Sequence, residues 1–135
     1  MKGSYVLLLR VKRNAELRVG KLGKVRFNKG FYAYVGSAMN SLEKRIARHM
    51  RKRKSVFWHI DYLLGCGDVE IDSVFIKESN VKEECIVASK LAEKFRAIRN
   101  FGCSDCRCGS HLFIVSDKKM LERLLRESGF RRRLW

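Results

Sequence analysis

The residues best suited to chemistry lie in a tyrosine-rich segment, residues 30–38, and in the basic segment that follows it. The tyrosine-rich segment reads Gly-Phe-Tyr-Ala-Tyr-Val-Gly-Ser-Ala and includes Tyr34. Arg45 and His49 come soon after it, and Tyr5 stands in a Gly-Ser-Tyr sequence near the amino terminus. A phenol can hydrogen-bond or accept a proton, and a guanidinium pairs bidentately with phosphate oxygens. This combination of side chains indicates the handling of a phosphate group.

A strongly basic composition points to a polyanionic partner. The 135 residues carry a formal charge of +16, and the pI is about 10.1. Much of this charge is concentrated in residues 42–54, with seven Lys or Arg side chains against the single Glu43, and in Arg131–Arg133. Clustered cations neutralise phosphates and release counterions, so we expect nucleic-acid contacts. The expected contact residues are Arg48, Arg51, Lys52, Arg53 and Lys54. The alternative is a soluble basic protein whose charge opposes aggregation.

Length and composition favour one domain, residues 1–135, in the cytoplasm. This length is enough for a core without covalent staples. No apolar run approaches the ~20 residues of a membrane span, and no secretory signal follows the amino terminus. Five cysteines without such a signal argue against a disulfide framework.

The sequence pattern predicts an α/β fold with a small, mainly antiparallel sheet flanked by helices. Asn40 with Glu43, and Asn80 with Glu83, resemble capping boxes that open two of the helices. The predicted strands are residues 4–11, 16–19, 24–27, 31–35, 69–76 and 112–115; the predicted helices are residues 40 to about 53, 56–64, 80 to about 99 and 117 to about 126. The strands at 16–19 and 24–27 form a hairpin. No repeat or linker interrupts this pattern, which supports a single domain.

Helical spacing places two of the candidate residues at the border of a buried face. The first helix has an apolar stripe of Leu42, Ile46 and Met50. Arg45 and His49 each lie three residues after a stripe position, along the margin of the stripe. Both side chains can therefore reach the strand that carries the tyrosines. The alternative for Arg45, taken alone, is a cation on a solvated face.

Three separated segments resemble the GIY-YIG nuclease superfamily. They are Gly3-Ser4-Tyr5, Tyr34-Val35-Gly36 and the spacing Leu42-x-x-Arg45-x-x-x-His49. The chain is most similar to an archaeal and bacterial branch of this superfamily, through the blocks Gly30–Ala38, His59-Ile60-Asp61 and Asp105-Cys-Arg-Cys-Gly-Ser-His111. The resemblance covers nearly the whole chain. It implies a GIY-YIG-like fold with a hairpin inserted across residues 12–29, between the two tyrosine motifs.

The resemblance also implies roles for individual residues. Tyr5 and Tyr34 would pair across neighbouring antiparallel strands, Arg45 would contact the scissile phosphate, and His49 is a further candidate catalytic residue. Glu84 would hold one divalent metal, Mg²⁺ or Mn²⁺, which needs few protein carboxylates because it keeps several waters. The other carboxylates close to this position in the sequence are Glu78, Glu83 and Glu93. Each tyrosine has the alternative of being a core residue of its strand.

Soft metal ligands gather near the carboxyl end of the chain. Cys103, Cys106, Cys108 and His111 could supply a tetrahedral zinc site, in which His59 or Cys85 could replace one member. Four ligands within nine residues strain a single site, so zinc is possible but not favoured. We expect reduced, metal-free thiols, with His111 near the tyrosines. The alternatives are a packed loop, or a role for His59 and His111 in the active site.

Together these features predict a divalent-metal-dependent endonuclease that hydrolyses DNA phosphodiesters, in repair or in the processing of branched or damaged DNA. A second hypothesis is a non-catalytic module that binds RNA or DNA with the same basic surface. A third is a zinc-stabilised adaptor. We expect DNA as the partner more than RNA, and no membrane; the sequence points to no protein partner.

Overall fold

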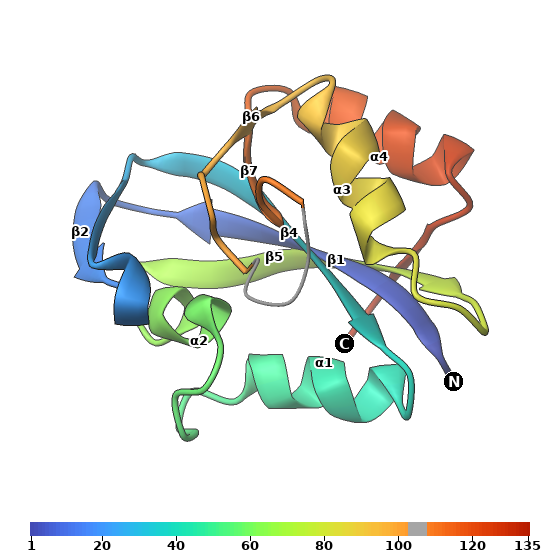
Figure 1. The fold of residues 1–135 in the computed structure, drawn as a ribbon, viewed down its shortest axis with the longest axis horizontal. Coiled ribbons are helices and arrows are strands. Elements are labelled where there is room, and N and C mark those ends of the chain that lie inside the picture. Colours follow the sequence, from blue (N-terminus) through green and yellow to red (C-terminus); the bar gives the residue numbers. More distant parts are fainter. Residues whose placement is uncertain (103–107) are drawn as a thin grey trace.

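The computed structural model describes residues 1–102 and 108–135, and it has the predicted α/β architecture (Figure 1). Its strands are β1 (Gly3–Val11), β2 (Ala15–Arg18), β3 (Lys24–Phe27), β4 (Gly30–Ala38), β5 (Val69–Glu78), β6 (Arg96–Ala97), β7 (Leu112–Val115) and β8 (Arg131–Arg133). Its helices are α1 (Leu42–Met50), α2 (His59–Leu64), α3 (Glu84–Ala92) and α4 (Lys118–Glu127), and a 3-10 turn covers Gly20–Leu22.

Within the described residues, six strands form one sheet in the order β6-β7-β4-β1-β5-β8. All neighbouring pairs are antiparallel. The first strand, β1, is one of the two central strands and pairs with the other, β4, along its whole length. In this register Tyr5 lies opposite Gly36, and Leu7 lies opposite Tyr34. The inserted hairpin forms as predicted, because β2 and β3 make a separate two-stranded sheet.

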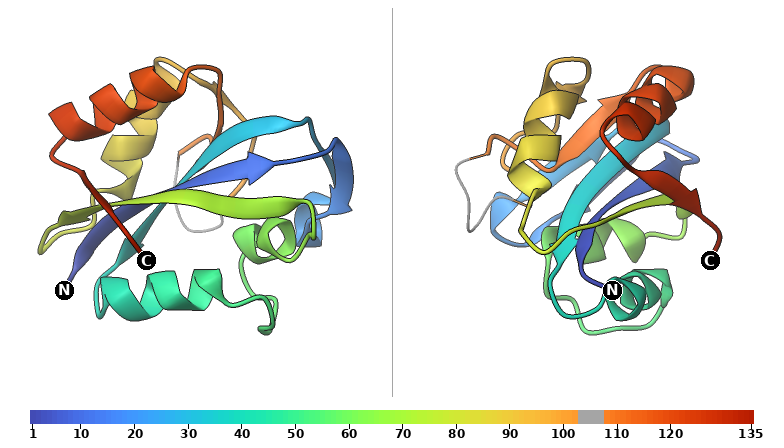
Figure 2. Two further views of the ribbon diagram at one scale, coloured as in Figure 1. Left: turned by 180° about the vertical axis from the view of Figure 1, so that it is seen from behind. Right: turned by 90° about the vertical axis from the view of Figure 1, so that its right-hand side faces the viewer.

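Helices cover both faces of the sheet. The helices α1 and α2 lie against one face, and α3 and α4 lie against the other (Figures 1 and 2). Alternate residues of β1 enter the two cores: Tyr5, Leu7 and Leu9 pack with α1, α2 and the hairpin, whereas Val6 and Leu8 pack with α3 and α4. Strand β1 is therefore buried on both faces, which explains its nearly continuous apolar sequence.

Several predicted boundaries are wrong. Helix α1 begins at Leu42, because the Ser41 hydroxyl, and not the Asn40 amide, accepts the backbone N–H of Lys44. It ends at Met50 rather than near residue 53. There the Lys54 ammonium donates to the backbone carbonyls of residues 48, 49 and 51, groups that a longer helix would use internally.

The third helix and the last strand also differ from the prediction. Helix α3 begins at Glu84 without a side-chain cap, because the Glu83 carboxylate is bound to the Lys77 ammonium at 2.8 Å. It ends at Ala92, and the chain continues into the short strand β6. Residues 131–133 form the edge strand β8, paired with β5, which the run of three arginines did not indicate. Helix α4 has the predicted Asp117 cap.

Among the described residues, no helix is both long enough and apolar enough to cross a membrane.

Candidate active site

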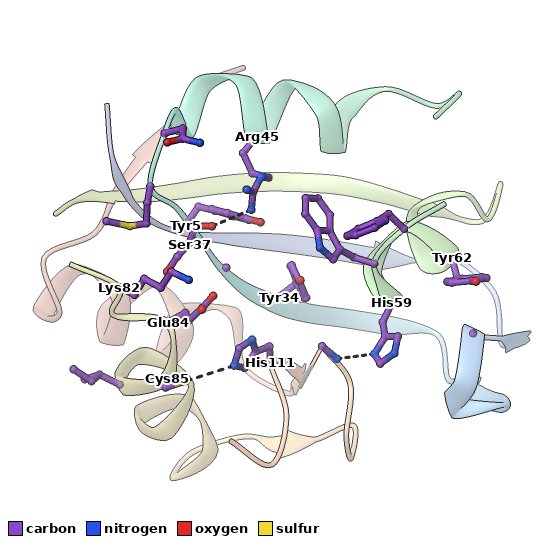
Figure 3. A pocket seen from close by; sticks show the side chains of 18 of the residues that line it. Tyr5, Tyr34, Ser37, Arg45, His59, Tyr62, Lys82, Glu84, Cys85 and His111 are labelled. Atoms are coloured by element: carbon purple, nitrogen blue, oxygen red, sulfur yellow. Dashed lines mark hydrogen bonds between the residues drawn. The ribbon is translucent and has the colours of Figure 1, made fainter. Parts of the chain in front are cut away.

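A cleft of about 950 Å³ lies next to the part of β4 that extends beyond the end of its pairing with β7. Strand β7 pairs with β4 only across Phe31–Tyr34. Just beyond it, the Val35 N–H donates to the His111 carbonyl at 2.9 Å, and within residues 1–102 and 108–135 no further strand pairs with this edge of β4. The start of α3 comes to this edge from the opposite face of the sheet. The cleft thus receives side chains from β1, β4, α1, α2 and α3 (Figure 3).

Tyr5 and Tyr34 lie on the same sheet face as diagonal neighbours on adjacent strands, as the resemblance implies. Both line the cleft, although their side chains are only 2% and 8% exposed. The Tyr5 ring lies directly over Gly36, where an added Cβ would overlap the ring atoms. The glycine of the Tyr-Val-Gly sequence is therefore the surface on which the first tyrosine rests.

His49 is buried behind Tyr5. Its Nε2 atom lies 2.8 Å from the Tyr5 hydroxyl, and burial lowers the pKa of its imidazole to about 3. The ring is therefore neutral at physiological pH and carries one N–H. Among the described residues Nδ1 has no hydrogen-bond partner. Placing the hydrogen on Nε2 leaves only a lone pair unsatisfied, which costs less than a buried N–H, so His49 donates to the Tyr5 oxygen.

Arg45 crosses the mouth of the cleft from α1. One guanidinium nitrogen donates to the Ser37 carbonyl at 3.0 Å, and the group lies 4.6 Å from the ring centre of Trp58 (Figure 3). The guanidinium of Arg48 lies over the same indole at 4.3 Å. Trp58 is thus stacked with two cations from successive turns of α1. Sequence reasoning missed it, although it directly precedes the His59-Ile60-Asp61 block.

Arg48 and Lys54, two of the predicted phosphate contacts, have hydrogen-bond partners within the protein. Arg48 donates two hydrogen bonds of 2.9 Å to the carboxylate of Asp61, which is 1% exposed. Lys54 donates to the end of α1, as described above. Their charges are therefore used inside the protein. Arg51, Lys52 and Arg53 are exposed. Lys52 makes one long hydrogen bond to the Val69 carbonyl at 3.4 Å and keeps further donors, so all three cations remain available to a phosphate backbone.

Glu84 is the carboxylate at the cleft. It is the first residue of α3, and its side chain points into the space between Arg45 and His111 (Figure 3). Burial is the main reason that the pKa values of Tyr5 and Tyr34 are raised; the negative charge of Glu84 raises both further, and Arg45 lowers both. Among the other candidate carboxylates, Glu83 is bound to Lys77.

His59 and His111 lie at the floor of the cleft. The Nδ1 atom of His59 accepts the Gly102 N–H at 2.8 Å, so this side chain fixes the backbone at the end of a loop. His111 is 4% exposed, and its Nε2 atom lies 4.0 Å from the Cys85 sulfur. Burial lowers the pKa of both imidazoles. The predicted position of His111 near the tyrosines agrees with the structure.

The predicted cysteine group is only partly described. Cys103 and Cys106 lie outside the described residues. Cys108 lies close to Cys85 and His111, and ligand atoms of these three residues all lie within 4.8 Å of one another. His59 is not a member of this group.

A family model described as "Domain of unknown function DUF123" matches residues 4–132. The chain belongs to this family. Neither the curated proteins nor the solved structures contain a match to this chain.

The cleft of the DUF123 domain brings the two motif phenols, Tyr5 and Tyr34, together with the Arg45 guanidinium and the Glu84 carboxylate. Further residues that sequence reasoning did not select also line it: Lys21, Met39, Asn40, Phe57, Trp58, Tyr62, Lys82 and Ile86. Of these, only Phe57 and Trp58 could have been selected from the sequence, because they form an aromatic pair next to the cations of residues 51–54. A cation and hydroxyl donors facing a carboxylate can bind and polarise a phosphodiester.

Proposed function

We propose that this DUF123 domain is a divalent-metal-dependent endonuclease of the GIY-YIG type that hydrolyses DNA phosphodiester bonds. The observation that supports the proposal is that four candidate side chains from different parts of the chain meet in one cleft. Tyr5, Tyr34, Arg45 and Glu84 come from β1, β4, α1 and α3, and all four line one cleft. These are the positions at which the superfamily motif requires functional side chains. A stable fold alone would not require two phenols, a guanidinium and a carboxylate to face the same space.

Glu84 is the residue that would hold Mg²⁺ or Mn²⁺. Its carboxylate is a hard oxygen ligand in a solvent-accessible cleft, and a cation of this class keeps several waters and accepts one or two protein carboxylates. The donor set therefore fits the metal. When bound, such a cation neutralises charge that develops on the phosphate oxygens.

Arg45 would bind the scissile phosphate. Its guanidinium keeps one hydrogen bond to the Ser37 carbonyl and a stacking contact with Trp58, which hold it across the cleft mouth. Five N–H groups in a planar fork leave donors free for phosphate oxygens. The side chain is thus oriented before the substrate arrives, which reduces the cost of reorganisation in the transition state.

Tyr5 would orient the attacking water through its hydroxyl, and only its ionised form could take the water's proton. Burial keeps the phenol protonated at neutral pH, because its pKa is raised. Two neighbours favour the ionised form that a base requires: Arg45 lowers this pKa, and His49 donates a hydrogen bond to the oxygen. Tyr34 presents the second hydroxyl on the same face and would bind a phosphate oxygen.

Phe57 and the exposed cations would bind the DNA beside the cleft. Phe57 lines the cleft and is 78% exposed, while its backbone N–H is fixed by the Asp61 carboxylate at 2.9 Å. An exposed aromatic ring on a rigid backbone can stack on an unpaired base. This feature favours branched or damaged DNA over intact duplex as the substrate.

The test is cleavage of plasmid, branched DNA and structured RNA with Mg²⁺ or Mn²⁺. We expect cleavage of branched DNA by the native chain, and its loss in Tyr34→Phe and in Glu84→Ala. Tyr32→Phe is the matched control on the same strand face, because the Tyr32 hydroxyl donates to the Asn28 carbonyl. Glu93→Ala is the control for a carboxylate at the far end of α3. Tight binding to DNA without cleavage under every metal condition would favour the non-catalytic module.

A further inference from the structure

The group of Cys85, Cys108 and His111 is separate from the phosphodiester chemistry but lies at the same cleft. Cys85 is the second residue of α3, and His111 directly precedes β7. The two residues are 26 positions apart in the sequence, yet the Cys85 sulfur and the His111 Nε2 atom are only 4.0 Å apart. The fold thus brings soft ligands from two elements to one point.

We propose that Cys85, Cys108 and His111 form a binding site for a thiolate-preferring divalent metal, with Zn²⁺ as the physiological class. Two sulfurs and one imidazole are typical zinc ligands, and three protein ligands leave a fourth position for another donor. A hard cation such as Mg²⁺ does not select thiolates. The site is therefore distinct from Glu84 and does not depend on the proposed nuclease activity.

The spacing of the ligand atoms fits this metal. Zinc bonds of ~2.3 Å to sulfur and ~2.0 Å to nitrogen, at tetrahedral angles, place the ligand atoms about 3.5–3.8 Å apart. In the structure the three ligand atoms lie within 4.8 Å of one another. A contraction of about 1 Å or less, within reach of side-chain rotation, would close the site. Crowding, which disfavoured zinc on residues 103–111 alone, is relieved because Cys85 comes from a helix.

The surroundings are suited to a bound ion. The His111 imidazole is 4% exposed and is held by the backbone hydrogen bonds that join its segment to β4 and to Phe101. Cys85 and Cys108 are partly exposed, so an ion can reach the sulfurs. A metal here would join the start of α3 to the segment before β7, and would fix the neighbouring Glu84 at the cleft.

The test is metal binding by the full chain, kept reduced with a phosphine. We expect about one Zn²⁺ per chain, and Co²⁺ should give the charge-transfer absorption of a cobalt thiolate. Cys85→Ser, Cys108→Ser and His111→Gln should each weaken binding by at least about 100-fold. Cys66→Ser is the matched control, because Cys66 is a partly buried thiol outside the group. It should bind zinc as the native chain does.

A second measurement keeps the test independent of how the variants fold. X-ray absorption at the zinc edge of the native protein should report at least two sulfur ligands and one imidazole. Fewer than two sulfurs, no zinc uptake, or a disulfide joining Cys85 to Cys108 in the protein isolated without reductant would each overturn the proposal. Cleavage with Mg²⁺, measured with and without a zinc-selective chelator, is scored separately, so failure of either proposal can be recognised alone.

Discussion

Arg45 is held at the cleft by the Ser37 carbonyl and by Trp58, and these contacts lead to a first prediction. Arg45→Ala should lower turnover on branched DNA by about 100-fold or more, because it removes a preorganised donor to the phosphate. Arg45→Lys should restore only part of the activity, since a point charge cannot replace the planar fork. Turnover is measured at saturating substrate, with thermal unfolding as the check on the fold. Arg51→Ala is the control, and unchanged cleavage by folded Arg45→Ala would remove this residue from the mechanism.

Gly36 supports Tyr5, and this contact leads to a second prediction. Gly36→Ala should lower the free energy of unfolding by about 1–3 kcal/mol, because the new Cβ overlaps the buried Tyr5 ring and the core has no room to accept it. Gly67→Ala is the matched control, since a Cβ there meets no atom within 4 Å. Urea denaturation of the two variants gives the comparison. Equal stability would mean that the ring moves aside at little cost.

The loop that joins α1 to α2 is held by one buried carboxylate. Hydrogen bonds from Arg48 and from the N–H groups of Phe57 and Trp58 lower the pKa of Asp61, against the opposing effect of burial. Asp61→Asn should cost about 3 kcal/mol of stability, because it leaves the Arg48 guanidinium without its partner. The substitution should also free the Trp58 side chain from its contacts. The tryptophan emission should then shift to longer wavelength, because the indole is more exposed to solvent. Asp68→Asn, at a partly exposed ion pair, is the control and should change stability by less than about 1 kcal/mol.

The exposed cations after α1 lead to a prediction about salt. Replacing Arg51, Lys52 and Arg53 by Gln should reduce the slope of log K against log salt by roughly one for each phosphate contact that is lost. The loss of affinity should be similar for different DNA sequences, because phosphate contacts carry no sequence information. Binding is measured by fluorescence anisotropy at several salt concentrations. A slope that survives the triple replacement would move the DNA-binding surface to β8.

Much of the fold could be predicted from residues 1–78, because β1, β4 and β5 have strong apolar patterns. The boundaries that failed depend on contacts distant in the sequence. Glu83 has a side chain suited to a helix cap, but its carboxylate forms an ion pair with Lys77 of β5 instead. The arginines of β8 carry no strand signal in the sequence. They form a strand because their backbone pairs with the edge of β5.

The candidate site could be predicted in part for similar reasons. The resemblance to the GIY-YIG superfamily pointed to Tyr5, Tyr34, Arg45 and Glu84, and the fold brings all four to one cleft. It could not identify the partners of Arg48, because Asp61 lies on another helix. The same limit applies to Cys85, whose relation to His111 depends on how α3 packs against the sheet edge.

At the scale of the whole molecule, all three histidines have lowered pKa values in the folded chain, and burial is the first cause in each. The unfolded chain therefore binds more protons than the folded chain once the pH falls below the ordinary histidine value of 6.5. Stability should decrease as the pH drops from about 7 to 5. His49 contributes up to about 1.4 kcal/mol per pH unit below its ordinary pKa, and His59 and His111 add to the decrease in the same direction.

Urea denaturation of the metal-free chain at several pH values measures this dependence. His49 stays neutral until its pKa of about 3, so His49→Gln should make the decrease less steep over the whole range. Carboxylates with lowered pKa values, such as Asp61, add to the loss only at lower pH. A stability that is constant or rises on acidification would contradict the burial of these imidazoles.

The central position of β1 has a consequence for synthesis on the ribosome. Strand β1 precedes both of its neighbours, β4 and β5, in the sequence. Its apolar residues therefore remain unpaired until those two strands have been synthesised. The inserted residues 12–29 lengthen the chain between β1 and its first partner, β4. The β2–β3 hairpin keeps the two ends of this insertion close, because Val11 at the end of β1 lies opposite Gly30 at the start of β4. The second partner, β5, is synthesised only after α1 and α2. The apolar β1 segment therefore lacks its full set of partners until β5 has been made, and in this period the nascent chain is most exposed to aggregation.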